Sequence, residues 1–486
     1  MTGIVSQMRP RVRFAVLTAV FVLAFEFFAL PAAAATCVFA PPAVTVDVGA
    51  GETATIGRSG DDITLNGVTC GGATVANTDT IAVTTAGVPT EIAIDLTAGP
   101  LAPGLTPEAD GSEIEITIDL PSGTPTLRIL GSSVVDRIVA GADGVNLNSD
   151  ETTADADITI TGSPALVIEG GDGDDVLSLG GGAGTGTTGR QGSLLGQAGN
   201  DRLLGGVAGS AFDGGIGTDE VDYTSATQLQ SANLSTGQVI HQGGGTDTLA
   251  GIENLTGSPG DDRIVGDGSD NAIDGGDGID TIDFSAASAV NVDLRAGRAV
   301  GDGTDGLSSI ENVIGSPFAD HIVGDGGANL LDGGPGDDKI DGGGGDDTLA
   351  GRDGSDTVSF QSATEGVTVS LRRGTAEGNG ADTLEGFENV VGTPQADEIH
   401  GDGARNRLDG RRGPDQVHGG GLADIILGGD GNDLLFGQSG NDTLLGESAK
   451  DQLDGGQDRD VCKGGPGPDS FVFCETINAG PLIRLI

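Results

Sequence analysis

The sequence predicts an all-β protein, most of it a parallel β-roll or β-solenoid preceded by a β-rich region. A nine-residue unit, G-G-x-G-x-D-x-U-x with U a large apolar residue, repeats nine times without a break over residues 392–472. Upstream, short runs alternate apolar and polar residues with the period of a strand, and no long stretch has helical periodicity. A repeat this regular predicts stacked coils, each of which contacts only its neighbours.

The composition limits both the core and the partners. Among 486 residues there are 89 Gly, one Tyr, 14 Phe and no Trp, so a thick aromatic core is excluded. The formal charge of −50 makes nucleic acid and anionic membranes poor partners, because both attract basic surfaces. Chains this acidic are often disordered. Here, however, Asp recurs at fixed spacing among Leu, Ile and Val, which a disordered polymer would not need.

The chain begins with a predicted signal peptide, residues 1–35. Three Arg precede an apolar run over residues 14–30 and an Ala-rich stretch, and cleavage is expected after Ala34 or Ala35. These features predict bacterial export and a secreted, extracellular protein with no membrane span once the signal is removed. An uncleaved membrane anchor is the alternative, although the run is barely long enough to cross a bilayer.

Four Cys are present, and export makes disulfide bonds possible. Four Cys allow three connectivities, and proximity in the sequence favours the pairs Cys37–Cys70 and Cys462–Cys474. A zinc site is the rival interpretation, but no C-x-x-C motif occurs and the four His are scattered. We therefore expect one disulfide near each end of the mature chain.

Residues 36–169 are predicted to form the β-rich N-terminal region. Alternating runs rich in Val, Ile and Thr occur at residues 43–48, 91–96, 113–120, 157–162 and 166–171. One stretch, GSSVVDRIV at 131–139, matches the nonapeptide in its Asp and Ile positions. The region is therefore either the start or cap of the solenoid or a separate β-domain such as a sandwich.

The repeat region is predicted to span residues 170–472, followed by a tail at 473–486. It holds 21 units, and three inserts, predicted as wider coils or hairpins, interrupt them at 223–256, 284–314 and 360–391. Each insert carries a Glu followed by Asn, at Glu253, Glu311 and Glu388. We interpret these Glu as a ladder of structural side chains, with a second set of ligands as the alternative.

The unit itself predicts cation sites. Its Gly residues permit tight turns that point carbonyls inward, and the Asp at position six brings a carboxylate to the same turn. Two units make one coil, so stacking aligns the turns in two ladders with a spacing of 18 residues. The gaps between rungs are lined by hard oxygen ligands, which suit Ca²⁺ better than Mg²⁺ because Mg²⁺ needs a tighter octahedron.

We therefore expect multiple Ca²⁺ ions, held by the Asp at position six of 17 units. These are Asp175, Asp201, Asp219, Asp262, Asp280, Asp320, Asp338, Asp347, Asp356, Asp397, Asp415, Asp424, Asp433, Asp442, Asp451, Asp460 and Asp469. Asn fills the position in three units, at Asn271, Asn329 and Asn406, where weaker sites are expected. Ser210 fills it in the remaining unit and is expected to contribute little or nothing.

These tandem units resemble the RTX, or haemolysin-type, calcium-binding repeats. The resemblance covers residues 170–472 and implies a parallel β-roll with Ca²⁺ held between successive turns by the position-six Asp and by turn carbonyls. Besides the Asn and Ser units, two features depart from the family pattern. Cys462 occupies a core position that the repeat gives to Leu or Ile, and the signal is N-terminal, whereas many RTX proteins use a C-terminal one.

No enzyme motif accompanies the repeats. No His lies in H-E-x-x-H and no Ser in G-x-S-x-G, while His321, His400 and His418 fall at outward positions and are expected to be solvated. One buried Leu or Ile per unit offsets only part of the entropy lost on ordering nine residues, so we expect the repeats to fold on binding Ca²⁺.

These observations predict a secreted, non-enzymatic calcium-binding protein with a structural or surface-adhesive role and a cell-surface or matrix partner. The alternative is a secreted hydrolase with an unrecognised active site in residues 37–169 or in the inserts.

Overall fold

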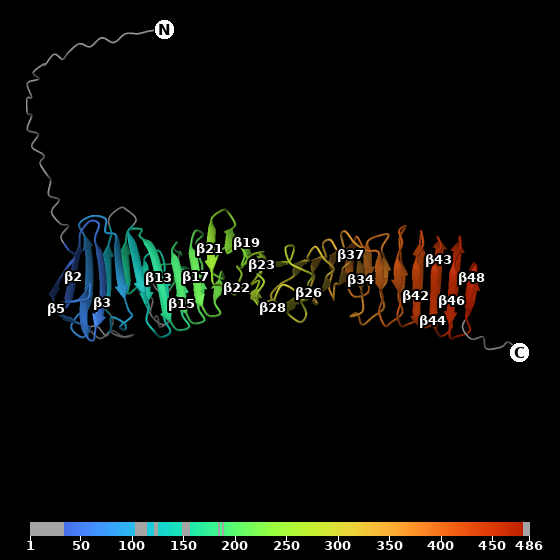
Figure 1. The fold of residues 1–486 in the computed structure, drawn as a ribbon, viewed down its shortest axis with the longest axis horizontal. Coiled ribbons are helices and arrows are strands. Elements are labelled where there is room, and N and C mark those ends of the chain that lie inside the picture. Colours follow the sequence, from blue (N-terminus) through green and yellow to red (C-terminus); the bar gives the residue numbers. More distant parts are fainter. Residues whose placement is uncertain are drawn as a thin grey trace, which may run out of the picture.

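The computed structural model describes residues 34–102, 114–120, 125–147, 156–182, 185–186 and 189–479. Within them every regular element is a strand, 48 in all, which confirms the all-β prediction. The strands form coils that follow one another along one long axis (Figure 1). This part of the chain holds no helix long and apolar enough to cross a membrane. Residues 1–33 of the predicted signal peptide lie outside the described residues.

The repeat coils are built from short strands that alternate between two sheets, A and B. For example, β39 (Glu398–His400) lies in sheet B and β40 (Arg407–Asp409) lies in sheet A. Each strand pairs in parallel with the equivalent strand one coil later, so that Ile399 lies opposite Val417. The position-eight side chains, such as Ile399 and Leu408, are fully buried between the sheets. One apolar residue per unit therefore makes the core, as the repeat predicts.

The N-terminal region is built from the same two sheets. Sheet A continues through β2 (Ala43–Val48), β6 (Thr80–Thr85) and β8 (Glu115–Asp119). Sheet B continues through β3 (Thr53–Ser59), β7 (Glu91–Asp95), β9 (Thr126–Leu130) and β13 (Ala165–Asp172). These strands are longer, and Thr80 lies opposite Glu115, so one coil here takes about twice the residues of a repeat coil. The described strands of residues 36–169 thus form the first coils of the solenoid.

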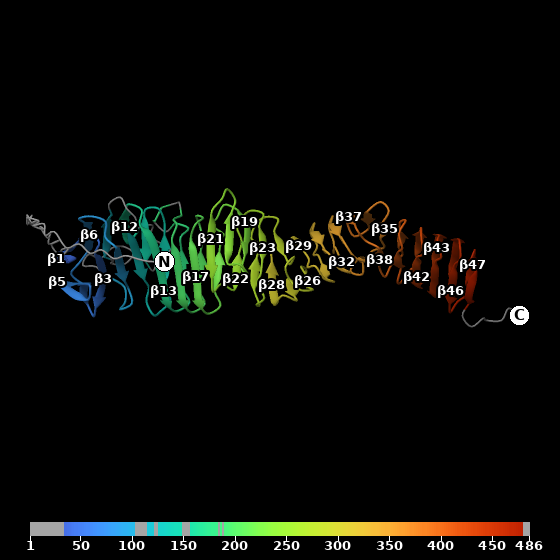
Figure 2. The ribbon, with the colours of Figure 1, turned by 45° about the horizontal axis from the view of Figure 1, so that its top comes forward.

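Each predicted insert is a three-stranded antiparallel unit within one sheet. Its third strand pairs in parallel with the coil before it and its first strand with the coil after it. The insert strands are β19 (Leu229–Asn233), β20 (Gln238–His241) and β21 (Thr246–Ala250) in sheet B, β26 (Asn291–Asp293), β27 (Arg298–Val300) and β28 (Thr304–Ser308) in sheet A, and β35 (Thr368–Ser370), β36 (Thr375–Glu377) and β37 (Ala381–Glu385) in sheet B. In Figure 2, β19 and β37 lie along the upper side and β26 and β28 along the lower side.

A fourth unit of this kind lies in the N-terminal region, where the sequence showed no insert. It consists of β10 (Arg137–Ala140), β11 (Gly144–Leu147) and β12 (Ile158–Thr161) in sheet A. The third strand pairs with β8 before it, and the first pairs with β14 (Val176–Ser178) of the first repeat unit. The three-stranded unit is therefore a feature of the whole solenoid.

A disulfide bond lies at each end of the solenoid, with the pairing that the spacing predicts. Cys37 in β1 (Thr36–Ala40) bonds Cys70 in β5 (Val68–Thr74). These two strands are the outermost strands of sheets A and B at this end. The first disulfide therefore joins the free edges of the two sheets.

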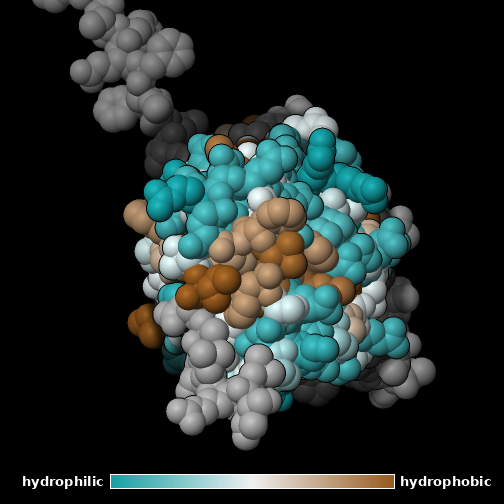
Figure 3. Space-filling view, turned by 90° about the vertical axis from the view of Figure 1, so that its right-hand side faces the viewer, coloured by the Kyte–Doolittle hydropathy of each residue, from teal (hydrophilic) through white to brown (hydrophobic). Residues whose placement is uncertain are grey.

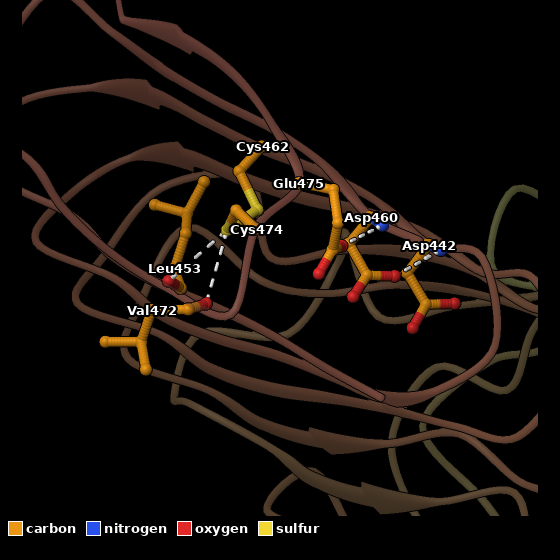
Figure 4. The surroundings of a disulfide bond; sticks show 7 residues. All are labelled: Asp442, Leu453, Asp460, Cys462, Val472, Cys474 and Glu475. Atoms are coloured by element: carbon orange, nitrogen blue, oxygen red, sulfur yellow. Dashed lines mark hydrogen bonds between the residues drawn. A yellow bond between two sulfur atoms is a disulfide. The ribbon is translucent and has the colours of Figure 1, made fainter. Parts of the chain in front are cut away.

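At the C-terminal end Cys462 bonds Cys474 (Figure 4). The first part of the predicted tail is the last strand of sheet A, β48 (Thr476–Ala479), and residues 480–486 lie outside the described residues. Val472, Phe473 and Ile477 in this last coil are about half exposed or more. Figure 3 shows an apolar patch with a hydrophilic rim on this end face.

Candidate calcium sites

The position-six residues form two continuous hydrogen-bonded ladders. On one edge the Asp433 N–H donates to Asp451 Oδ1 at 3.1 Å, and on the other the Asp442 N–H donates to Asp460 Oδ1 at 2.8 Å. The same bond, from one residue to the carboxylate 18 residues later, recurs along the repeats. Where extra residues intervene it spans a longer separation, as from the Asp175 N–H to Asp201 Oδ1 at 2.8 Å. One carboxylate oxygen of each rung is thus engaged by the main chain of the coil before it.

At each insert one ladder passes through the Glu residue, and the other passes through an Asp of the third insert strand, Asp247, Asp305 or Asp382. Glu253, Glu311 and Glu388 each accept the N–H of the position-six Asp one coil earlier, at 2.8, 2.8 and 2.9 Å. Glu475 does the same for Asp460 at 2.8 Å and ends its ladder beside the terminal disulfide (Figure 4). This geometry favours the interpretation of the insert Glu residues as structural side chains of the ladder over the alternative that they are a second set of ligands.

The other carboxylate oxygen of most rungs is buried and has no hydrogen-bond partner. These twelve Oδ2 atoms belong to Asp175, Asp201, Asp219, Asp280, Asp338, Asp356, Asp415, Asp424, Asp433, Asp442, Asp451 and Asp460. Burial of an unpaired carboxylate oxygen costs free energy unless a donor or a cation satisfies it. The ladder therefore leaves a periodic row of unsatisfied anionic oxygens just beneath the turns.

These oxygens lie directly over the first Gly of each unit. A Cβ added to Gly437 would lie 2.5 Å from Asp442 Oδ2 and 2.4 Å from the carbonyl oxygen of Gly455, one coil later. The equivalent positions at Gly446 and Gly428 meet the same pair of atoms. A carboxylate oxygen and a main-chain carbonyl oxygen therefore converge in a cradle that only Gly leaves open.

Burial and crowding of the rung carboxylates raise their pKa values. Burial raises the pKa of Asp338, Asp424 and Asp451 to about 7 and that of Asp415 to about 8. The main-chain N–H bond opposes this shift, and neighbouring carboxylates add to it. A bound divalent cation would hold these groups in the ionised form.

The donors fit Ca²⁺, which binds carboxylate and carbonyl oxygens in a flexible shell. Within the described residues no three His, Cys, Asp or Glu side chains come together in a group that could hold a metal ion. The orphaned Asp oxygens would therefore anchor the ion, and turn carbonyls such as that of Gly455 would supply most of the remaining ligands.

In three of the predicted Asp ligands, both carboxylate oxygens already accept hydrogen bonds from the protein. Asp397 Oδ1 accepts the Val367 N–H at 2.9 Å and the Thr393 hydroxyl at 2.8 Å, and its Oδ2 accepts the Thr393 N–H at 2.7 Å. Asp262 and Asp320 have the same arrangement, with a Ser two residues into the unit in place of Thr393. All three open a block after an insert. A Ser or Thr at position two was the sequence signal that separates them from the orphaned rungs.

The remaining two predicted Asp ligands are rungs of the same ladders. Asp347 accepts the Asn329 N–H at 2.9 Å, and Asp469 accepts the Asp451 N–H at 3.1 Å. Asp136, in the 131–139 stretch that matches the repeat, was not among the predicted ligands. It accepts the Ser132 N–H at 2.5 Å and donates its own N–H to Asp175 Oδ1 at 2.7 Å. Asp136 therefore begins the ladder that continues through Asp175, one coil before the predicted repeat region.

A hydrogen bond explains why three units have Asn instead of Asp at position six. Asn271, Asn329 and Asn406 each follow an insert Glu by 18 residues and donate Nδ2–H to its main-chain carbonyl, at 2.8, 2.9 and 3.0 Å. An Asp could not make this bond, since a carboxylate only accepts. In two of these units the same amide also donates to a carboxylate of its own unit, that of Asp267 or Asp325, at 3.2 Å.

The Ser210 unit is stabilised by a buried polar cluster of its own. Asp247, from the neighbouring insert strand, accepts the Ser210 N–H at 2.7 Å through Oδ1. Its Oδ2 contacts His241 Nε2 at 2.7 Å and accepts the Tyr223 hydroxyl at 3.1 Å, and all of these residues are buried. Asp247 therefore has both oxygens satisfied by the protein, and this turn needs no metal for that purpose.

A second, outer ladder runs along position five and was not predicted. The Lys450 N–H donates to Asn432 Oδ1 at 3.1 Å, and the Ser355 N–H donates to Asp337 Oδ1 at 2.9 Å. The frequent D-D and N-D pairs at positions five and six were the signal for it. Where this outer bond occurs, two adjacent coils are held together by an exposed and a buried side-chain bond at the same turn.

The outward His residues are less solvated than predicted. His400 and His418 stack at 4.6 Å between ring centroids, and His418 stacks in turn on Phe436 at 4.6 Å. The rings lie at position nine of successive coils in sheet B, so the repeat itself sets their spacing. Burial lowers the pKa of His321 and His418.

Comparison with known proteins agrees with this geometry. The family model described as RTX calcium-binding nonapeptide repeat (4 copies) matches residues 167–185, 247–282, 305–340, 323–358, 385–417, 418–452 and 437–471. No curated protein matches the chain. The chain therefore carries RTX calcium-binding nonapeptide repeats over these segments, folded as a two-sheet parallel β-roll.

Proposed function

We propose that the protein is a secreted calcium-binding solenoid whose repeat coils fold on binding Ca²⁺, and that it serves as a non-enzymatic structural or adhesive component outside the cell. The observation that supports this most is the row of twelve buried, unpartnered Asp oxygens. Without a cation they oppose stacking of the coils, and with one they hold adjacent turns together.

Modest affinity at each site is sufficient for this role. A site with Kd ~0.1 mM in ~1 mM Ca²⁺ stabilises the folded state by about 1.4 kcal/mol, and the contributions of separate sites add. Each repeat unit buries one large apolar side chain, which contributes about 1.5–3 kcal/mol. A coil of two units therefore gains about 2.8 kcal/mol from two such sites, against about 3–6 kcal/mol from its two apolar side chains, so Ca²⁺ supplies a substantial share of the free energy that decides whether the coil folds.

A calcium titration of the mature protein tests the coupling. Far-UV circular dichroism and small-angle X-ray scattering should report a gain of β-structure and a smaller radius of gyration as Ca²⁺ rises to millimolar concentration. Equal concentrations of Mg²⁺ serve as the control and should produce little change, because Mg²⁺ requires a tighter octahedral shell. Identical spectra and dimensions with and without Ca²⁺ would contradict the proposal.

The non-enzymatic role has a separate test. The mature protein is assayed against ester, glycoside and peptide substrates, with and without Ca²⁺. We expect no turnover above that of a buffer blank. Turnover that disappears on replacing an acidic residue outside the ladders would overturn this part of the proposal and favour a hydrolase.

A further inference from the structure

We propose that residues 34–169, called the template segment below, fold without Ca²⁺ and provide the preformed end on which the calcium-dependent coils assemble. The inference rests on the proposed function, in which the coils after residue 169 need Ca²⁺. It assigns a direction to folding and divides one continuous solenoid into two parts with different requirements.

The first support is the density of the core. The described residues between 80 and 114 bury seven large apolar side chains, namely Ile81, Val83, Ile92, Ile94, Leu96, Leu101 and Ile114. Residues 428–463, a stretch of similar length, bury Leu435, Leu444, Leu453 and Cys462. Apolar burial is the main favourable term in folding. The template segment therefore has a larger driving force of its own than the repeat coils.

The second support is the state of the buried acids. Asp157 Oδ2 accepts the Leu147 N–H at 2.5 Å, and Glu169 pairs with Arg128 through Oε1 and accepts the Gln197 side chain at 2.7 Å through Oε2. Among the described residues before 170, no Asp or Glu oxygen is buried without a hydrogen-bond partner, whereas thirteen such oxygens follow, starting at Asp175, and twelve of them belong to the ladders. The described part of the template segment thus has no anionic row that a cation must neutralise.

The third support is covalent. The Cys37–Cys70 bond lies wholly within the template segment and joins the outermost strands of the two sheets. A cross-link between residues 33 apart reduces the entropy of the unfolded segment and so favours its folded form. The other disulfide, Cys462–Cys474, spans only the last coil.

The last strands of the folded template segment offer backbone hydrogen-bonding groups with which the strands of the next coil can pair. β13 pairs in parallel with β15 (Ser193–Ala198), and β10 pairs with β14 at the start of the repeats. In a solenoid each coil is stabilised by its neighbour, so a coil added to an existing edge avoids the cost of a new nucleus. Ca²⁺ would then stabilise successive coils outward from residue 170.

Hydrogen exchange measured by mass spectrometry on the full mature chain tests the division. Peptides from residues 34–169 should exchange at least about a hundredfold more slowly than an unfolded chain both in calcium-depleted buffer and in millimolar Ca²⁺. Peptides from residues 257–479 should be protected only with Ca²⁺. Loss of protection of the template segment in calcium-depleted buffer would overturn the inference and leave the proposed function standing. Protection of the repeats without Ca²⁺ would overturn both.

Two matched core variants make the result specific. Ile94→Ala should speed exchange in the template segment at least tenfold in both buffers, because it removes a fully buried side chain there. Leu435→Ala should speed exchange only in the C-terminal coils in Ca²⁺ and leave the template segment unchanged. An effect of Leu435→Ala on the template segment in calcium-depleted buffer would contradict the proposed division.

Discussion

At the residue scale, identical Asp residues in identical repeat positions have different chemical environments. Asp442 has a buried oxygen without a partner, whereas Asp397 has both oxygens bonded to Val367 and Thr393. The period predicted where each carboxylate lies. The period alone does not show which carboxylates are satisfied, because that depends on a Ser or Thr at position two of the same unit and on an N–H group that the preceding insert brings to the turn.

The contrast between these two residues predicts different effects of the same substitution. Asp442→Asn should lower the number of bound Ca²⁺ ions by at least one and reduce stability in Ca²⁺ by about 1.4 kcal/mol, the contribution of one site. In calcium-depleted buffer it should not destabilise, since it removes a buried charge. Asp397→Asn is the control: it should leave the ion count unchanged but destabilise the protein in both buffers. Native mass spectrometry and denaturant unfolding measure the two quantities, and equal ion loss in both variants would contradict the assignment.

The buried cluster around Asp247 makes a second prediction at this scale. His241→Gln removes the imidazole contact at 2.7 Å and should destabilise the surrounding coil by about 1–3 kcal/mol, because a buried carboxylate loses a partner. Hydrogen exchange of peptides spanning residues 205–256 in Ca²⁺ measures the effect. His321→Gln, at a half-buried position in another coil, is the control. If exchange of these peptides in His241→Gln is no faster than in the His321→Gln control, the His241 contact contributes nothing.

At the element scale, the turn and the short strand follow directly from the repeat, whereas the inserts do not. The alternation of Gly, Asp and an apolar residue predicted both ladders and the buried position eight. The order of the three insert strands depends on pairings with the coils before and after, which are not local in sequence. For the same reason the unit formed by β10, β11 and β12 was not recognised, although its ladder residue Asp136 lies in a stretch that matched the repeat.

The cradle over the first Gly of a unit can be tested with a single methyl group. Gly437→Ala places Cβ within 2.5 Å of Asp442 Oδ2 and of the Gly455 carbonyl, and should destabilise by about 1–3 kcal/mol while weakening Ca²⁺ binding. Gly403→Ala is the matched control, since nothing lies within 4 Å of its added Cβ. Thermal unfolding and calcium titration of both variants check the prediction, and similar losses in the two would argue against the cradle.

At the scale of the whole molecule, the charge of −50 and the raised pKa values link folding to pH as well as to Ca²⁺. Burial raises the pKa of Asp338, Asp424 and Asp451 from 3.8 to about 7 in the folded, metal-free form. A group whose pKa is raised on folding favours the folded state fully below the unfolded value and loses that contribution as pH rises through the folded value.

The calcium-free protein should therefore become less stable as pH rises from about 4 to about 7. Over the upper part of the same range Ca²⁺ affinity should increase, because binding releases the protons held by the ladder. Circular dichroism in calcium-depleted buffer and calorimetry in buffers of different ionisation enthalpy measure the two trends. A metal-free form whose stability rises over this range would contradict the assignment.

The central claim is that the orphaned oxygens of the ladders bind Ca²⁺, and an anomalous difference map from crystals grown in Ca²⁺ tests it most directly. The account predicts anomalous peaks about 2.3–2.6 Å from Oδ2 of Asp433, Asp442 and Asp451, repeated from coil to coil along both edges. A well-ordered map in which these oxygens contact only water or protein donors, with no anomalous peak beside them, would contradict it.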